Sequence, residues 1–319
     1  MDALMIMLRN VLLFVALALP GFLLVKTGHL QQEGSGVLSK FLMYVGMPFL
    51  ILSGTVNLSF SKELLVTVGV AALIGIGYTV LMFFCSSPLS RMEKNAKTRG
   101  MMRFCAVFSN NGFLGIPLAI AIFGADSPVM TVLIILNIIT NLLMYTLGAY
   151  LVSGDKKSIS LKNAFLNPIL IAFLMGVVIN LTGLTDFVPE IATYSTHFSN
   201  IVTPVSMTVL GVKMGAVKGN TLFRSWKTYY VSALKLLLFP MAILAALLAL
   251  RAIVPDGVVD SPMILGVFIA FAMPTGGLAT TFADRYSGDA ENAVAFTLGS
   301  TLLSILSIPA LYAILCLFL

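Results

Sequence analysis

The chain has 319 residues, of which 59% are hydrophobic and only 10% are charged, and its formal net charge is +6. Soluble domains carry about 25% charged residues, so the composition excludes a soluble protein and indicates an integral α-helical membrane protein. The positive charge does not indicate a nucleic-acid partner, because the basic residues lie in short loops, where membrane topology signals are found.

Apolar stretches that could cross a bilayer follow one another along the chain, since a spanning helix needs about 20 residues. The first runs through Pro20 to Val25 without a small-residue cleavage site, so we expect a retained span and not a signal peptide. We predict ten transmembrane spans, at about residues 5–25, 34–55, 64–85, 101–123, 128–152, 165–184, 191–216, 228–250, 262–283 and 290–318.

Lysine and arginine are distributed unequally between the loops on the two sides. The loops on one side have little beyond Lys62 and Arg251. The loops on the other side carry most of the basic residues, namely Lys26, Arg91, Lys94, Lys97, Arg99, Lys156, Lys157, Lys162, Lys218, Arg224, Lys227 and Arg285. Basic loops stay in the cytoplasm. The sequence therefore predicts a multi-pass protein of the plasma (inner) membrane with both termini on the extracytoplasmic side.

The two halves of the chain resemble each other. The segment FSNNGFLGIPLAIAIFGADS from Phe108 aligns with FAMPTGGLATTFADRYSGDA from Phe271, and Pro48 aligns with Pro204 in the preceding parts. We predict two five-span repeats, at 1–153 and 164–319, joined by a short cytoplasmic loop at 154–163. An odd number of spans in each half gives the halves opposite orientations, an inverted repeat of the kind found in secondary transporters.

Spans four and nine each contain residues that interrupt a helix near its centre. Glycine permits unusual backbone shapes and proline removes an amide donor. Unwound backbone at membrane depth is tolerated only inside protein or beside an aqueous cavity, and the helix that starts after it attracts anions. These breaks predict an anion site, with a pair of ordinary proline kinks as the alternative. The interrupting residues are Asn110, Asn111, Gly112, Pro274, Thr275, Gly276 and Gly277.

The same residues carry a family resemblance. SNNGFLGIPL resembles the fourth-span motif of the auxin efflux carrier family, and AMPTGGLATTFADRYSGD is similar to its ninth-span pattern of a proline followed by F-A-x-x-Y. The resemblance covers essentially the whole chain. By motif position, Asn110 matches the asparagine at the family's helix crossover and Pro274 matches its ninth-span proline.

The resemblance implies a fold like that of the bile-acid symporters, with ten helices and broken crossover helices 4 and 9. It implies a scaffold of helices 1, 2, 6 and 7 and a mobile transport domain of helices 3–5 and 8–10, which moves like an elevator and carries the substrate at the crossover. The short loop at 154–163 resembles that of bacterial members. This favours small mono- or dicarboxylates, such as malate or malonate, over auxin.

Four polar residues extend the candidate substrate site. Asn137 and Asn141 lie one turn apart in span five, and Ser300 and Ser304 occupy the matching positions in span ten. Each pair therefore shares one helix face. These side chains form either a polar wall behind the breaks or hydrogen bonds between helices.

Two further sets of residues have open roles. Lys235 in span eight has two possible roles: it pairs with the charge of the substrate or takes part in ion coupling, or its side chain snorkels to the interface. For Lys213, snorkelling is the simpler interpretation. Thr203 and Ser206, on either side of a proline in span seven, are candidates for lining the scaffold side of the site.

Acidic residues at the span ends have plainer interpretations. Asp126 and Asp289 are candidate proton sites, but ADSPV and GDAEN begin spans five and ten, where Asp or Ser caps free amides and Pro suits the first turn. Capping is the favoured interpretation. Asp284 and Arg285 at the end of span nine are expected to form a local ion pair.

The leading functional hypothesis is a secondary transporter or efflux carrier of small organic anions, with a proton or sodium as a possible coupling ion. A sodium-coupled symporter of the bile-acid-symporter type is the nearest alternative, and a membrane-embedded enzyme or a sensor is further away, because HExxH and GxSxG motifs are absent. We expect no cofactor, no metal site and no nucleic-acid partner. The lipid bilayer is the expected environment, and a homodimer is possible.

Overall fold

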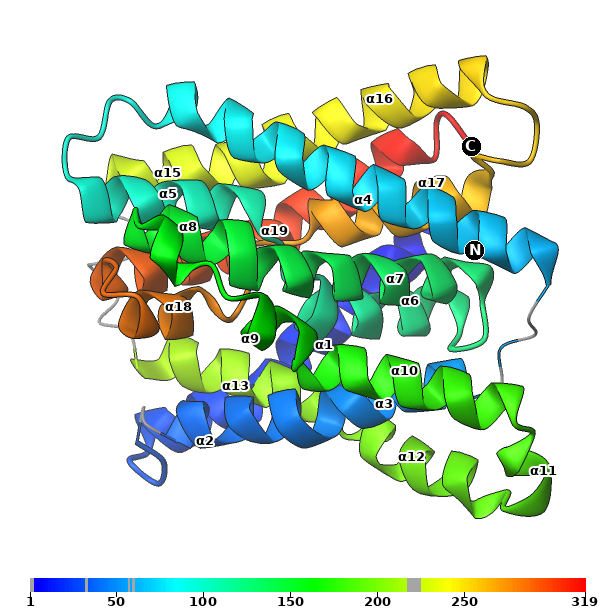
Figure 1. Ribbon diagram of the computed structural model, residues 1–319. Coiled ribbons are helices and arrows are strands. Elements are labelled where there is room, and N and C mark those ends of the chain that lie inside the picture. The colour runs from blue at the N-terminus through cyan, green and yellow to red at the C-terminus, as the bar shows by residue number, and fades with distance from the viewer. Residues whose placement is uncertain (1–2, 32–33, 57, 59–60, 217–224) are drawn as a thin grey trace.

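The structure is a computed structural model that describes residues 3–31, 34–56, 58, 61–216 and 225–319. Lys218 and Arg224, two of the predicted cytoplasmic basic residues, lie outside the described residues. Within them, every regular element is a helix (Figure 1). The helices are α1 Ala3–Lys26, α2 Gly34–Phe41, α3 Met47–Thr55, α4 Lys62–Leu89, α5 Ala96–Val107, α6 Ile116–Phe123, α7 Pro128–Leu143, α8 Ala149–Ser153, α9 Leu161–Phe165, α10 Pro168–Leu181, α11 Leu184–Phe187, α12 Glu190–Asn200, α13 Val202–Ala216, α15 Trp226–Ala233, α16 Phe239–Ile253, α17 Ser261–Ala272, α18 Ala279–Arg285 and α19 Ala290–Leu315.

Short π-helical turns continue several of these helices. Turns η1 Leu42–Gly46, η3 Met144–Gly148 and η5 Leu234–Leu238 join α2 to α3, α7 to α8 and α15 to α16, and η2 Asn111–Gly115 begins the helix of α6; η4 Lys156–Ser158 is a 3₁₀ turn. Within the described part of the chain, six helical stretches are long and apolar enough to cross a membrane, namely Gly34–Thr55, Lys62–Leu89, Pro128–Ser153, Lys156–Leu181, Trp226–Ile253 and Ala290–Leu315.

Local sequence signals set many of the helix starts. Asp289 caps α19 by accepting a hydrogen bond from the Asn292 amide at 3.1 Å, which confirms its expected role. At α7 the residue at the cap position is Ser127 and not Asp126, and Pro128 follows at the first helical position, as ADSPV predicts, but no side chain caps this helix by a hydrogen bond. Proline needs no amide partner there, so α7 begins without a side-chain cap.

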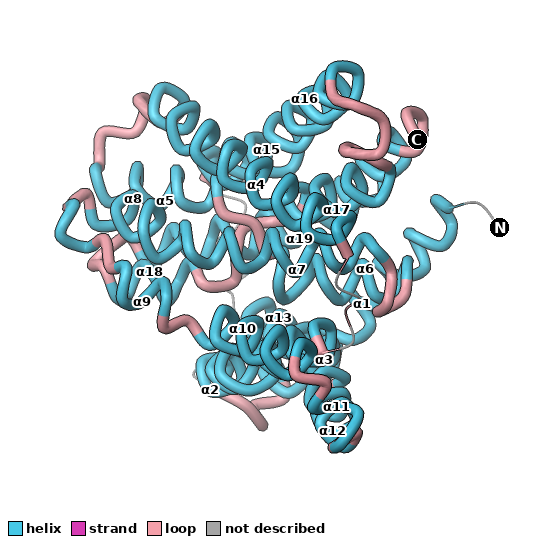
Figure 2. The backbone as a smooth tube through the Cα atoms, turned by 45° about the vertical axis from the view of Figure 1, so that its right-hand side comes forward, coloured by secondary structure: helices cyan, strands magenta, loops and turns pink. Residues whose placement is uncertain are grey.

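The helices pack in two groups, which Figure 2 shows one above the other. In one group α1 lies along α13, and α3 packs on α10 and α12. In the other group α7 packs on α4 and α17, and α19 packs on α5, α15 and α18. The groups touch where α1 meets α6 and α19 and where α13 meets η2.

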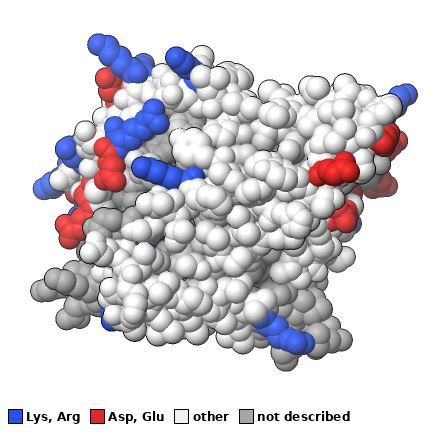
Figure 3. All heavy atoms as spheres, turned by 90° about the horizontal axis from the view of Figure 1, so that it is seen from below, with Lys and Arg blue, Asp and Glu red and all other residues white. Residues whose placement is uncertain are grey.

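The surface is that of a membrane protein. Charged side chains gather toward two opposite ends of the molecule, with a broad uncharged belt between them (Figure 3). Large apolar side chains are exposed on the helices between those ends, among them Leu73, Val178 and Leu306. Water does not tolerate such extended apolar patches, so a lipid environment accounts for the belt.

Candidate functional site

The two predicted breaks lie side by side in the core. The chain leaves the helical conformation after α5 and again after α17, and Ser109 pairs with Thr275 as an isolated antiparallel bridge. The Asn110 amide donates to the Pro274 carbonyl at 2.8 Å, and the Gly276 amide donates to the Phe108 carbonyl at 3.0 Å. Each break therefore supplies hydrogen-bond partners for backbone groups that the other has freed.

Side chains from neighbouring helices fix this pairing from behind. The Thr275 amide donates to Ser300 Oγ of α19 at 3.2 Å, and Thr275 Oγ1 donates to the Cys105 carbonyl of α5 at 2.9 Å. Ser300 thus makes an interhelical hydrogen bond that supports the break. Thr275 acts in the same way, because both of its polar groups are engaged inside the protein.

Lys235 reaches the same point from turn η5. Its side chain is fully buried, and Nζ donates to Ser109 Oγ at 2.5 Å and to the Val107 carbonyl at 3.5 Å. The snorkelling interpretation of Lys235 is therefore wrong. No carboxylate of the described chain pairs with its amino group, so a lysine without an acidic partner lies directly behind the first break.

A chain of amides packs against the other side of that break. Asn137 Nδ2 donates to Asn111 Oδ1 and Asn111 Nδ2 donates to Thr140 Oγ1, each at 3.0 Å. Asn141 Nδ2 donates to the Asn137 carbonyl at 2.8 Å. Gly112 makes the approach possible, because a Cβ there would lie 2.8 Å from Asn137 Nδ2. The interhelical interpretation thus describes the contact of Asn137 with Asn111, whereas Asn141 donates to Asn137 within its own helix α7.

A cavity of about 810 Å³, which we call the vestibule, lies between α2 and α13 of one group and α18 and α19 of the other. Three cationic side chains and one carboxylate line it: Lys40, Lys213, Arg285 and Asp284. The expected ion pair between Asp284 and Arg285 is wrong: the two described side chains form no salt bridge, and the Arg285 guanidinium lies over the Tyr286 ring, 5.7 Å from its centroid.

Two smaller cavities of about 40 Å³ each flank Asn110. The first, the amide cavity, is lined by Ser109, Asn110, Asn111, Gly112, Asn137, Asn141, Gly276 and Gly277, with apolar neighbours. The second, the lysine cavity, is lined by Ser39, Asn110, Ser206, Lys213, Gly277, Thr297 and Thr301, again with apolar neighbours. Lys213 and Thr297 also line the vestibule, which places the lysine cavity next to it.

Lys213 does not snorkel away from the protein. Its Nζ donates to the Gly277 carbonyl at 3.3 Å, across the boundary between the two helix groups. Lys213 and Thr297 are site residues that the sequence did not indicate. Nothing local to either residue distinguishes it, because only the packing of α13 and α19 against the breaks brings both to one cavity.

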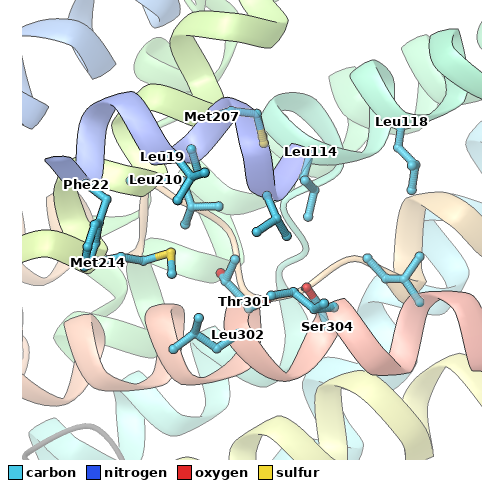
Figure 4. Close-up of a pocket in the computed structure, with 15 residues that line it drawn as sticks. Leu19, Phe22, Leu114, Leu118, Met207, Leu210, Met214, Thr301, Leu302 and Ser304 are labelled. Atoms are coloured by element: carbon cyan, nitrogen blue, oxygen red, sulfur yellow. Dashed lines mark hydrogen bonds between the residues drawn. The ribbon is translucent and has the colours of Figure 1, made fainter. Parts of the chain in front are cut away.

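A third pocket, of about 240 Å³, is almost wholly apolar. Figure 4 shows its side chains pointing into the gap between α1 and α13 on one side and α6 and α19 on the other, with Leu19, Leu114, Met207 and Leu302 among them. Ser304 lies here and not at the breaks, and its hydroxyl donates to the Thr301 carbonyl of its own helix. The pocket is an apolar joint between the two groups.

Pro274 and Thr203 are the predicted residues that remain, and neither lines a cavity described above. The Pro274 carbonyl accepts the Asn110 amide, and the Thr203 carbonyl accepts the Ser206 hydroxyl at 3.0 Å. Among the described residues, no cluster of three acidic, histidine or cysteine side chains could hold a metal ion.

Sequence comparison with known proteins identifies the family of this chain. The family described as membrane transport protein matches residues 5–163 and 157–312. The chain belongs to this family. The resemblance to auxin efflux carriers is thereby confirmed, and the family's members are transporters, which points to a protein that is not an enzyme.

Two archaeal relatives agree with the family assignment. An uncharacterized transporter of Methanothermobacter thermautotrophicus is 28% identical over 313 residues, which cover 94% of this chain and 96% of the relative. A second uncharacterized transporter, MJ1031 of Methanocaldococcus jannaschii, is 27% identical over 217 residues, or 66% of this chain and 70% of the relative. The protein is therefore a multi-pass membrane transporter.

Proposed function

We propose that the protein is a secondary transporter of small organic anions, mono- or dicarboxylates, which bind where the two helix breaks meet. The observation that carries this proposal is the antiparallel pairing of Ser109 with Thr275, which joins two broken helices at the inner end of a cation-lined vestibule. Irregular backbone inside a membrane protein is typical of substrate sites.

The lengths of corresponding elements support an inverted repeat of ten spans. The two members of each of three pairs are equally long, at 28, 12 and 26 residues for the three pairs in chain order. The order of the elements is also the same in both halves. The pairs are Lys62–Leu89 with Trp226–Ile253, α5 with α17, and Pro128–Ser153 with Ala290–Leu315.

The two helix groups supply the parts that an elevator mechanism needs. We assign α1–α3 and α10–α13 as the scaffold and α4–α8 and α15–α19 as the mobile domain, which carries both breaks. The apolar joint supports relative movement, because apolar side chains exchange contacts without breaking hydrogen bonds. In this structure the vestibule reaches the site from the end of the molecule that bears α2, α15 and α18 (Figure 1). The basic loops assign that end to the cytoplasm and both termini to the opposite side.

The chemistry of the vestibule favours an anion. Three cations against one carboxylate give its wall a net positive charge, which attracts anions and raises their local concentration. The helix of η2 and α6 begins at Asn111, and the first turn of a helix presents free amides and a partial positive charge. Lys235 adds a buried cation behind the same break. A carboxylate is the small organic anion that suits these donors.

Uptake of labelled carboxylates by proteoliposomes tests the proposal. Malate, malonate, acetate and lactate are offered under a proton gradient, a sodium gradient and neither, so the sodium-coupled alternative is separated by its ion requirement. We expect uptake of at least one carboxylate, and a loss of at least tenfold in Asn110→Ala. Asn200→Ala, an exposed asparagine at the end of α12, is the matched control. Vesicles that take up none of the four under any gradient refute the proposal.

A further inference from the structure

The two small cavities differ in how much of their hydrogen-bonding capacity the protein already uses. In the amide cavity, Asn111 is engaged through both ends of its amide, and the Asn137 and Asn141 amides each donate to a neighbour. Such a network is stable as it stands, and a ligand that entered would have to break it. The amide cavity is therefore a poor place for a charged group.

The lysine cavity has donors without adequate acceptors. Thr297 is only 4% exposed, and its hydroxyl Oγ1 has no hydrogen-bond partner in the described chain. The Asn110 side-chain amide makes no hydrogen bond to a described residue, and Lys213 donates only to a neutral carbonyl, with no carboxylate in reach among those residues. A buried hydroxyl without a partner is costly, so this cavity is incomplete without a ligand.

We propose that a carboxylate group of the substrate binds in the lysine cavity, between Lys213 Nζ, the Asn110 amide and the Thr297 hydroxyl. This assignment rests on the transport function proposed above. The size agrees: the cavity of about 40 Å³ holds about three water-sized atoms, the number of heavy atoms in a carboxylate. The rest of the substrate extends into the 810 Å³ vestibule that shares Lys213 and Thr297. The site is selective for the carboxylate and tolerant of what is attached to it.

The donors come from both helix groups, which gives binding a consequence for transport. Lys213 belongs to α13 of the scaffold, whereas Asn110 and Thr297 belong to the break and to α19 of the mobile domain. Without substrate, Lys213 holds the Gly277 carbonyl of the second break. A carboxylate is the better acceptor for an ammonium group, so binding replaces this link and releases the second break from the scaffold.

Four variants in the proteoliposome assay test the site with labelled malonate and malate. Lys213→Gln removes the charge, Lys213→Arg keeps it, and Thr297→Val removes only the hydroxyl at nearly constant volume. Lys162→Gln, an exposed lysine on α9 outside the cavities, is the control for loss of one charge. We expect KM to rise at least tenfold in Lys213→Gln and three- to tenfold in Thr297→Val. Lys213→Arg should recover part of the affinity, and Lys162→Gln should stay within twofold of the unchanged protein.

A thermal-shift titration with malonate on the same purified variants separates binding from folding. The unchanged protein and Lys162→Gln should gain stability with malonate, because a ligand that binds the folded state raises its melting temperature, and Lys213→Gln should not. Uptake by the unchanged protein with the same KM in Lys213→Gln overturns the assignment and leaves the transport function intact. Absence of both uptake and stabilisation in the unchanged protein overturns the two together.

Discussion

Replacement of Lys235 by methionine separates the functional value of a buried charge from its structural cost. Lys235 is wholly buried, and its ammonium group has two hydrogen-bond acceptors, Ser109 Oγ and the Val107 carbonyl, but no anionic partner. A charge buried in this way costs several kcal/mol of desolvation. Its hydrogen bonds return about 1.5–3 kcal/mol each at best, and the one to Val107 is long at 3.5 Å.

The desolvation cost of the Lys235 charge is equal to or larger than the stabilisation from its hydrogen bonds. Methionine has a similar length and no charge, so we expect the free energy of unfolding of Lys235→Met to be unchanged or higher by up to about 3 kcal/mol. A rise of about 3 kcal/mol corresponds to an apparent melting temperature higher by about 6–12 °C, at roughly 2–4 °C per kcal/mol. The expected gain in stability is unusual for a change in a core, where most substitutions destabilise.

Lys235→Met should bind the substrate more weakly than the unchanged protein, although its fold is as stable or more stable. Lys235 Nζ contacts Ser109, the residue before Asn110, so a carboxylate at the Asn110 side chain lies roughly two Cα spacings, or 8 Å, from the ammonium group. At that distance the attraction between the two charges is about 2 kcal/mol at an effective dielectric constant of about 20. Loss of that attraction lowers substrate affinity about 30-fold.

The assay is thermal unfolding in detergent together with carboxylate uptake by proteoliposomes, both made from one preparation. Leu236→Met, a size-conserving change at the next buried position of η5, controls for the insertion of methionine. A Lys235→Met protein that melts well below the unchanged protein shows that the ammonium group stabilises the fold, and unchanged uptake shows that transport does not use it. Either result refutes the reasoning.

Two further predictions concern stability. A Cβ on Gly211 would lie 1.9 Å from the Ala18 carbonyl, so Gly211→Ala should force α1 from α13 and cost about 1–3 kcal/mol; Gly36→Ala, with open space around it, should be neutral or stabilising in the same melting assay. The hydrogen bond from Lys227 and that from the Asn95 amide lower the pKa of Glu93 from 4.5, so the ion pair contributes at neutral pH and is lost as the pH falls below 4.5. The free energy of unfolding of Lys227→Met should therefore be lower than that of the unchanged protein by about 0.2–1 kcal/mol at pH 7, which appears as a slightly lower melting temperature. The difference should shrink as the pH falls below 4.5; a gap that persists in acid contradicts this account.

The sequence alone determined the class of the protein and the location of its breaks. Composition and the recurring apolar stretches require a membrane environment, because no arrangement of so few charges could cover a soluble surface. Glycine, proline and paired asparagines interrupt a helix through the local stereochemistry of the backbone. The motif of span four could therefore identify both the break at Asn110 and the family.

Only the tertiary structure decided what each polar side chain does. Ser300 and Thr275 hold the breaks together, Ser304 faces an apolar joint, and Lys235 is buried behind Ser109. Lys213 and Thr297 share a cavity although 84 residues (297 minus 213) separate them along the chain. The physical reason is that helix periodicity fixes which residues share a face, whereas the helix that each face meets depends on packing between segments that are distant in sequence.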